Sequence, residues 1–131
     1  MSRKNPKRND YYAAASADDR FGMVYEGMVT CSRYKGLSLG AKQFYTLCRV
    51  QANSKIGKAC LYKHAETEGK QYAEGCFVFP STHQNRFGVN RQNGSRYFRE
   101  LINAGFIKLI EQNRHRHKPN VYQFSGKWRS D

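Results

Sequence analysis

The sequence predicts an α+β fold in which a three-helix core is followed by a β-hairpin, and three observations lead to this expectation. Apolar residues recur at helical spacing over residues 38–53. Two further helical segments within residues 81–104 are separated by a glycine-containing turn. Two short β-type segments within residues 106–124 then enclose a basic loop. We therefore expect one folded domain over residues 21–131, preceded by a disordered basic tail at residues 1–20.

Length and charge limit the classes of protein to which this chain can belong. Its 131 residues are enough for one domain with a modest core. The 23 Lys and Arg outnumber the 10 Asp and Glu, and the net charge of +13 predicts a polyanionic partner, nucleic acid first. No apolar run approaches the roughly 18 residues that span a bilayer. The basic N-terminus also lacks the apolar middle of a signal peptide, so we expect a cytoplasmic protein with no membrane partner.

The first elements lie before residue 54. Residues 21–29 are apolar enough to pack, although two glycines weaken a long helix there. Ser38 is a suitable cap for a helix that continues to Asn53, with an apolar stripe formed by Ala41, Phe44, Leu47 or Cys48, and Ala52. Residues 54–75 contain three glycines and a stretch at 59–66 that can form two helical turns. We interpret this segment as an insertion.

The next elements form two helices joined by a turn. Residues 76–79 read as a short buried strand that ends at Pro80, after which Ser81 or Thr82 begins a short helix. Gly88 permits a tight turn, and Asn90 can cap a second helix over residues 91–104. Its predicted inner face is apolar and its outer face is basic and polar. The inner face comprises Gly94, Tyr97 or Phe98, and Leu101, and the outer face comprises Gln92, Ser95, Arg96 and Arg99.

A β-hairpin is predicted after the second helix. Gly105 suits the left-handed position that ends a helix, and Phe106 supplies the accompanying apolar contact. Residues 106–112 and 121–124 read as paired strands, and the loop at 113–120 has a basic tip. A helix-turn-helix followed by a basic hairpin is the winged-helix arrangement, and we expect Tyr45, Tyr97 and Tyr122 inside its core.

The run from Asn90 to Ile110 resembles the winged-helix family of DNA-binding proteins. Its turn from helix to wing commonly reads Leu-x-x-x-Gly-hydrophobic-Ile, matched here by Leu101, Gly105, Phe106 and Ile107. The run Tyr34–Tyr45 is similar to the first helix of N-terminal domains of replication initiators encoded by plasmids and phages of Gram-positive bacteria. Their late Lys-Pro-Asn-x-Tyr corresponds to residues 118–122. The resemblance covers roughly residues 21–125.

The chemistry of the predicted recognition helix indicates how DNA would be read. Such a helix lies in the major groove with its N-terminal residues at base edges. Arg can donate two hydrogen bonds to guanine, and Asn or Gln can pair with adenine. The predicted base-reading residues are Arg91, Gln92, Asn93, Ser95 and Arg96. A solubilising surface is the alternative role for any one of these arginines.

Further contacts are expected on the DNA backbone and in the minor groove. A wing arginine can enter a narrow minor groove, and cations elsewhere can lie against phosphates. The predicted residues of this group are Arg86, Arg99, Arg114, Arg116 and Lys118. In the tail, Arg3, Lys4, Lys7 and Arg8 are expected to follow the DNA as a flexible arm, with a solvated terminus as the alternative.

The sequence therefore predicts a sequence-specific, double-stranded DNA-binding protein of a plasmid, phage or conjugative transposon. Its expected role is replication initiation or transcriptional control. Fold-level analogy alone leaves two alternatives, a relaxosome or DNA-transfer accessory protein and a winged helix that binds other replication or transfer proteins without reading DNA sequence. A homodimer is a further expectation, with residues 21–29 as the apolar contact segment.

We expect no enzyme activity, no catalytic residue, no cofactor and no metal. Cys31, Cys48, Cys60 and Cys76 form no closely spaced pair and are expected to be free thiols. One metal alternative remains, in which Cys60 and His64 share a helix face and Cys48 or Cys76 completes a zinc site. His115-Arg116-His117, with Tyr11 or Tyr12 as nucleophile, superficially resembles a rolling-circle nuclease. That family has an apolar residue between its histidines, so this interpretation is disfavoured.

Overall fold

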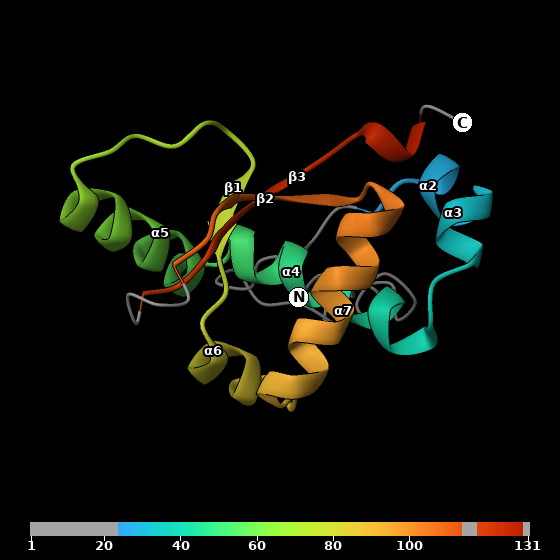
Figure 1. The fold of residues 1–131 in the computed structure, drawn as a ribbon, viewed down its shortest axis with the longest axis horizontal. Helices are drawn as coiled ribbons and strands as arrows, with labels where there is room; N and C mark the ends of the chain where they lie inside the picture. Colours follow the sequence, from blue (N-terminus) through green and yellow to red (C-terminus); the bar gives the residue numbers. More distant parts are fainter. Residues whose placement is uncertain (1–23, 114–117, 130–131) are drawn as a thin grey trace, which may run out of the picture.

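The computed structural model describes residues 24–113 and 118–129, which form an α+β fold with a small three-stranded antiparallel sheet (Figure 1). The α+β class predicted from the sequence is confirmed. The elements in chain order are α2 (Glu26–Thr30), α3 (Ser32–Lys35), α4 (Leu39–Asn53), α5 (Lys55–Glu68), β1 (Cys76–Val78), α6 (Ser81–Arg86), α7 (Arg91–Ala104), β2 (Ile107–Glu111), β3 (Val121–Phe124) and a 3-10 turn (Lys127–Arg129).

Local capping groups set the ends of the two longest predicted helices. The Ser38 hydroxyl accepts a hydrogen bond from the Ala41 amide at the start of α4. The Asn90 side chain accepts one from the Asn93 amide at the start of α7. Gly105 ends α7 with φ +87°, a conformation that favours glycine. These three predictions from the sequence are confirmed.

The helix α6 begins at Ser81, one of the two starting residues that the sequence predicted. Its N-cap is Pro80, and no side chain caps the helix there. Pro80 supplies its carbonyl oxygen to the amides of His83 and Gln84 instead. Proline suits this position because its missing N–H would have no helical partner.

The sheet brings together segments that are far apart in the chain. Its strand order is β1–β3–β2, and both neighbouring pairs are antiparallel. Val78 pairs with Val121, and Ile107 pairs with Phe124. β2 is shorter than the predicted strand over 106–112 because the Phe106 amide donates to the Leu101 carbonyl at the end of α7. A bulge between Leu109 and Glu111 shifts the register near the hairpin loop.

The core is built mainly from aromatic side chains. Phe44 of α4 meets Phe98 of α7 edge to face, with ring centroids 4.8 Å apart. Phe98 also stacks on Tyr122 of β3 at 3.9 Å, and Phe77 of β1 stacks on Phe124 at 4.7 Å. These contacts join both helices to the sheet. Of the three tyrosines expected inside, Tyr45 is buried, whereas Tyr97 and Tyr122 are half-buried.

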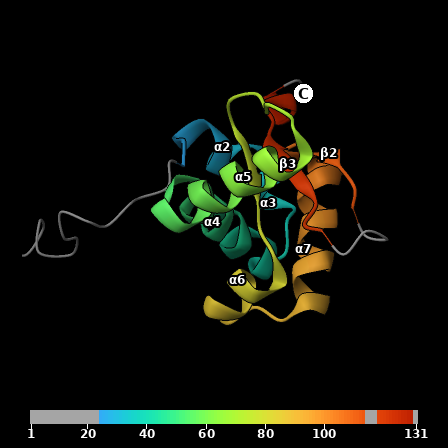
Figure 2. The same ribbon diagram turned by 90° about the vertical axis from the view of Figure 1, so that its left-hand side faces the viewer.

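The segment interpreted as an insertion is an integral part of the fold. It contains the 14-residue helix α5, longer than the two turns predicted over 59–66, and α5 packs against α4 and β1 (Figure 2). Ser54 caps the helix by accepting from the Gly57 amide at 3.0 Å. A Cβ at Gly57 would overlap the Gln51 carbonyl oxygen, so the absence of a side chain permits this close contact with α4. The same glycine lowers intrinsic helix propensity, which explains why the sequence pattern underestimates the helix.

Gly94 allows α6 and α7 to approach closely. A Cβ at Gly94 would overlap the side-chain oxygen of Gln84. Gln84 is buried, and its Nε2 donates a hydrogen bond to the Phe79 carbonyl at 2.8 Å. Gln84 therefore cannot move away without losing a buried hydrogen bond.

We expect Gly94→Ala to lower the free energy of unfolding by about 1–3 kcal/mol, because either the contact is overpacked or the Gln84 bond is lost. Urea unfolding measures this change. Gly27→Ala is the matched control, since Gly27 also lies in a helix but has nothing within 4 Å of the added methyl group. Equal effects of the two substitutions would contradict the packing role of Gly94.

Candidate nucleic-acid interface

The helix α7 presents a basic, polar face to solvent. Its buried side is formed by Gly94, Phe98 and Leu101, as the sequence predicted. The outward side carries five of the predicted DNA-contacting residues, all of them exposed: Arg91, Gln92, Ser95, Arg96 and Arg99. The structure thus brings these five side chains onto one face of a helix that is anchored through its other face.

The sixth predicted residue of this helix, Asn93, is placed differently. It is half-buried and lines a small cavity between α4 and the α6–α7 turn, where Gly40, Val89 and Tyr97 also lie. Its side chain is therefore less accessible than those of its neighbours on α7. Asn93 precedes Tyr97 by four positions and Glu100 by seven, so it lies on the side of α7 that faces the start of α4.

The turn between α6 and α7 orients the exposed end of α7. Gly88 adopts φ +82°, and the amides of Gly88 and Val89 donate to the Asn85 and Gln84 carbonyls. Arg86, expected to contact the DNA backbone, is exposed and its guanidinium lies 4.9 Å from the Phe87 ring centroid. Figures 1 and 2 both show α6 and the start of α7 at the end of the molecule away from the sheet.

The only acidic residue of α7 is directed away from the basic face. Glu100 accepts hydrogen bonds from the Ser38 amide at 3.0 Å and from the Ser38 hydroxyl at 2.8 Å. It thereby lies at the N-terminus of α4, where a negative charge is favourable. The exposed face of α7 consequently keeps its positive charge without an internal counter-charge from this helix.

The base of the β2–β3 hairpin is held by asparagine side chains. The Asn113 amide N–H donates to Asn120 Oδ1 at 2.7 Å, and Asn113 Nδ2 donates to the Pro119 carbonyl at 2.9 Å. Asn113 is buried, whereas Lys108 on β2 is exposed. The predicted wing residues Arg114 and Arg116 lie outside the described residues. The predicted tail contacts at Arg3, Lys4, Lys7 and Arg8, and the first residues of the 21–29 segment, also lie outside them.

Lys118 has a partner that the sequence did not indicate. It was expected to lie against the DNA backbone, but its Nζ lies 3.1 Å from Glu68 Oε1 of α5. This ion pair neutralises the Lys118 charge within the protein. It forms because α5, which the sequence analysis treated as part of an insertion, lies beside the hairpin.

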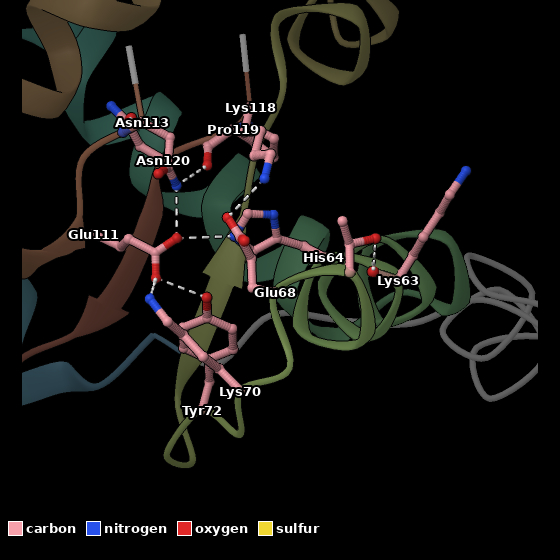
Figure 3. Close-up of polar contacts among 11 residues, drawn as sticks. Lys63, His64, Glu68, Lys70, Tyr72, Glu111, Asn113, Lys118, Pro119 and Asn120 are labelled. Atoms are coloured by element: carbon pink, nitrogen blue, oxygen red, sulfur yellow. Dashed lines mark hydrogen bonds and ion pairs between the residues drawn. The ribbon is translucent and has the colours of Figure 1, made fainter. Parts of the chain in front are cut away.

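A second polar group links α5 to the hairpin (Figure 3). Glu111 at the end of β2 accepts from His64 Nε2 at 3.0 Å and from Asn113 Nδ2 at 2.7 Å on one oxygen. Its other oxygen accepts from Tyr72 at 2.8 Å and Lys70 at 3.1 Å. Burial alone would raise the pKa of the Glu111 carboxyl, but these four donors outweigh it and hold the pKa well below its usual range.

The pKa of Tyr72 is raised to about 12, first because burial disfavours the phenolate and second because the Tyr72 hydroxyl donates to Glu111.

The sequence offered only the four-residue spacing of His64 and Glu68 as a signal for this polar group. Glu111 is more than forty positions away in the chain, and no local pattern connects it to α5.

The alternative zinc site, in which Cys60, His64 and either Cys48 or Cys76 would be the ligands, is wrong because His64 lies beside carboxylates and not beside cysteines. All four cysteines are free, and burial raises the pKa of the Cys48, Cys60 and Cys76 thiols. Within residues 24–113 and 118–129, the group of potential metal ligands that contains His64 includes Glu68 and Glu111 and no cysteine. His64 turns to the hairpin because its side of α5 faces β2.

No helix in the described part of the chain is long and apolar enough to cross a membrane.

A scan of protein-family models, a search of curated proteins and a search of solved structures each find no match for this chain.

His83 couples the orientation of α6 to α4. Gln51 Nε2 donates to the Val78 carbonyl at 3.1 Å and lies 2.7 Å from His83 Nδ1, which accepts when the imidazole is neutral. Burial first, and the Arg86 charge second, lower the pKa of His83 from its ordinary value. If His83 were protonated, its Nδ1–H would point at the NH₂ group of Gln51, and two donors would face each other. Rotating the Gln51 amide would relieve this contact but would place the Gln51 oxygen against the Val78 carbonyl oxygen. The folded state therefore disfavours the protonated form of His83.

We expect the free energy of unfolding to decrease as the pH falls through the ordinary histidine pKa of about 6.5. Because the folded-state pKa of His83 is lowered, the unfolded chain binds more protons in this interval, and stability rises with pH there. Urea unfolding at about pH 7.5 and pH 5.5 measures the effect. His83→Asn, which keeps an acceptor but does not titrate, should reduce the pH difference. If the difference in unfolding free energy between the two pH values is the same in His83→Asn as in the unmodified protein, the pH dependence arises from the other histidines.

Proposed function

We propose that this chain is a winged-helix protein that binds double-stranded DNA sequence-specifically and performs no catalysis. The observation that carries the proposal is the outward face of α7, where Arg91, Gln92 and Arg96 are exposed while the only acid of the helix faces α4. A face rich in hydrogen-bond donors with this spacing suits the edges of bases in a major groove. The net charge of +13 adds attraction to phosphates.

The order of elements supports this proposal. Helices α4, α6 and α7 would form the three-helix core, with α7 as the recognition helix, and the β2–β3 hairpin would form the wing. Within this arrangement, Arg91 and Arg96 would donate to guanine and Gln92 would pair with adenine. Arg86 and Arg99 would reach phosphates. Residues 113–120 would approach the minor groove or the backbone, with Arg114 and Arg116 as the contacting cations.

The proposed biological role is replication initiation or transcriptional control in a mobile genetic element such as a plasmid, phage or conjugative transposon. A second candidate is an accessory protein of DNA transfer, or a winged helix that binds other proteins. One observation favours this second candidate: Lys118 at the base of the hairpin is neutralised by Glu68. With Lys118 paired, the base of the hairpin would contribute less positive charge to DNA binding than the resemblance to winged-helix proteins implies.

The first test is selection of a binding site from a random-sequence duplex library at physiological salt, followed by affinity measurements on the selected duplex. Enrichment of a defined sequence is expected. An inverted repeat would show binding by a homodimer, and a single half-site would show binding by a monomer. Retention of DNA without any enriched sequence would contradict sequence-specific binding and favour the accessory role.

We expect Arg91→Ala with Arg96→Ala to weaken binding to the selected duplex by several kcal/mol, since each good base contact contributes about 1–3 kcal/mol. The salt dependence of the affinity should also decrease, by up to two phosphate-equivalent contacts. Fluorescence anisotropy at several salt concentrations measures both quantities.

The matched control is Lys55→Ala with Lys58→Ala, which removes the same charge from exposed positions at the start of α5. This control should leave the preference for the selected duplex over random DNA unchanged. If both double variants weaken binding equally, general electrostatic attraction accounts for the affinity and α7 does not read the sequence.

A further inference from the structure

We propose that His64, Glu68 and Glu111 bind a divalent transition-metal ion where α5 meets β2. One ligand atom from each residue, a ring nitrogen and two carboxylate oxygens, lies within 4.8 Å of the others. Imidazole nitrogen and carboxylate oxygen are common ligands of Zn²⁺ and related ions. This inference does not depend on the proposed DNA binding.

Two elements supply the three side chains (Figure 3). His64 and Glu68 are four residues apart on α5 and therefore lie on one face of the helix. Glu111 reaches them from the end of β2, where its carboxylate already contacts His64. All three are well shielded from solvent, with side-chain exposures of 5% for His64, 9% for Glu68 and 14% for Glu111. The ligand set is thus largely assembled by the fold.

The spacing of these atoms is close to that of a tetrahedral site. Bonds of about 2.0–2.1 Å to Zn²⁺ place neighbouring ligands roughly 3.4 Å apart. His64 Nε2 and Glu111 Oε1 are separated by 3.0 Å, and the widest separation in the group is at most 4.8 Å. Adjustments on the order of 1 Å, within the range of carboxylate rotation, would bring the third ligand into place. Water would complete the coordination.

Charge balance also favours a divalent cation. Two carboxylates and a neutral imidazole carry a charge of −2. Lys118 and Lys70 now compensate it separately, each contacting one of the two carboxylates. Both ammonium groups are on more exposed side chains, 31% for Lys118 and 53% for Lys70, so they can rotate into solvent. A single ion between the carboxylates would replace both lysines and leave the shielded ligands in place.

Neighbouring groups would keep Glu111 oriented toward the ion. The Tyr72 hydroxyl donates to Glu111 Oε2, and Asn113 Nδ2 donates to Oε1, so both can retain their bonds when the metal replaces the His64 contact. Such outer hydrogen bonds orient carboxylate ligands in metal sites. Because Asn113 also holds the hairpin loop, the ion would connect α5 to the base of the hairpin.

The experiment is thermal unfolding of the metal-free full chain with and without Zn²⁺. We expect Zn²⁺ in excess to raise the Tm of the unmodified protein by roughly 5 °C or more, because it binds the folded state selectively. His64→Gln and Glu111→Gln should abolish this increment. Glu66→Gln, an exposed position on the same helix, is the matched control and should retain it. Co²⁺ should give the visible absorption of a tetrahedral site only in proteins that retain the increment.

Three results would overturn the proposal: no increment in the unmodified protein, an increment retained in His64→Gln, or an increment lost only when His115 and His117 or the cysteines are replaced. If His64→Gln fails to fold, Glu68→Gln supplies the test through Zn²⁺ and Co²⁺ titration, since that change removes one ligand and the Lys118 ion pair while leaving the hydrogen bonds of Glu111 to Tyr72 and Asn113 in place. Arg91→Ala with Arg96→Ala should retain the increment, which separates this proposal from DNA binding.

Discussion

The packing of Phe98 determines the position of the basic helix face. Phe98 meets Phe44 of α4 edge to face and stacks on Tyr122 of β3, so one side chain connects the two central helices and the sheet. Aromatic rings bury large areas and have preferred mutual geometries, which makes this contact both strong and directional. With Phe98 directed inward, the 3.6-residue period of α7 places Gln92, Arg96 and Arg99 roughly 100–160° around the helix axis from it, toward solvent. The exposure of the candidate interface is therefore a consequence of the core.

Three acidic residues are held in contacts away from the outward face of α7. Glu68 and Glu111 are drawn into the contacts between α5 and the hairpin, and Glu100 is bound at the start of α4. The exposed start of α7 has no acidic residue, and it lies at the opposite end from the sheet (Figure 1). Like charges on α7 repel one another, but a separated surface of this kind attracts a polyanion. These three acidic residues serve packing and hairpin attachment, while Arg91, Arg96 and Arg99 of α7 are exposed.

Much of the fold could be predicted because its signals are local. Ser38 and Asn90 are caps whose partners lie three residues away, and Gly105 ends a helix by its own conformational freedom. The alternation of buried and exposed positions in α7 also follows from the sequence of that helix alone. The α5 helix was underestimated because Gly57 weakens its intrinsic propensity. Its stability depends on a tight contact with Gln51, which no local pattern records.

The sequence by itself determined the ends and faces of α4 and α7 and the positive charge, because these depend on neighbours within a few residues and on composition. Only the tertiary structure decided that Lys118 pairs with Glu68 and that His64 meets Glu111, since residues 47 or more positions apart have no shared periodicity. It also decided that Asn93 borders a cavity while Gln92 is exposed. These outcomes depend on how α5, the turn and the hairpin pack, and packing is a property of the whole chain.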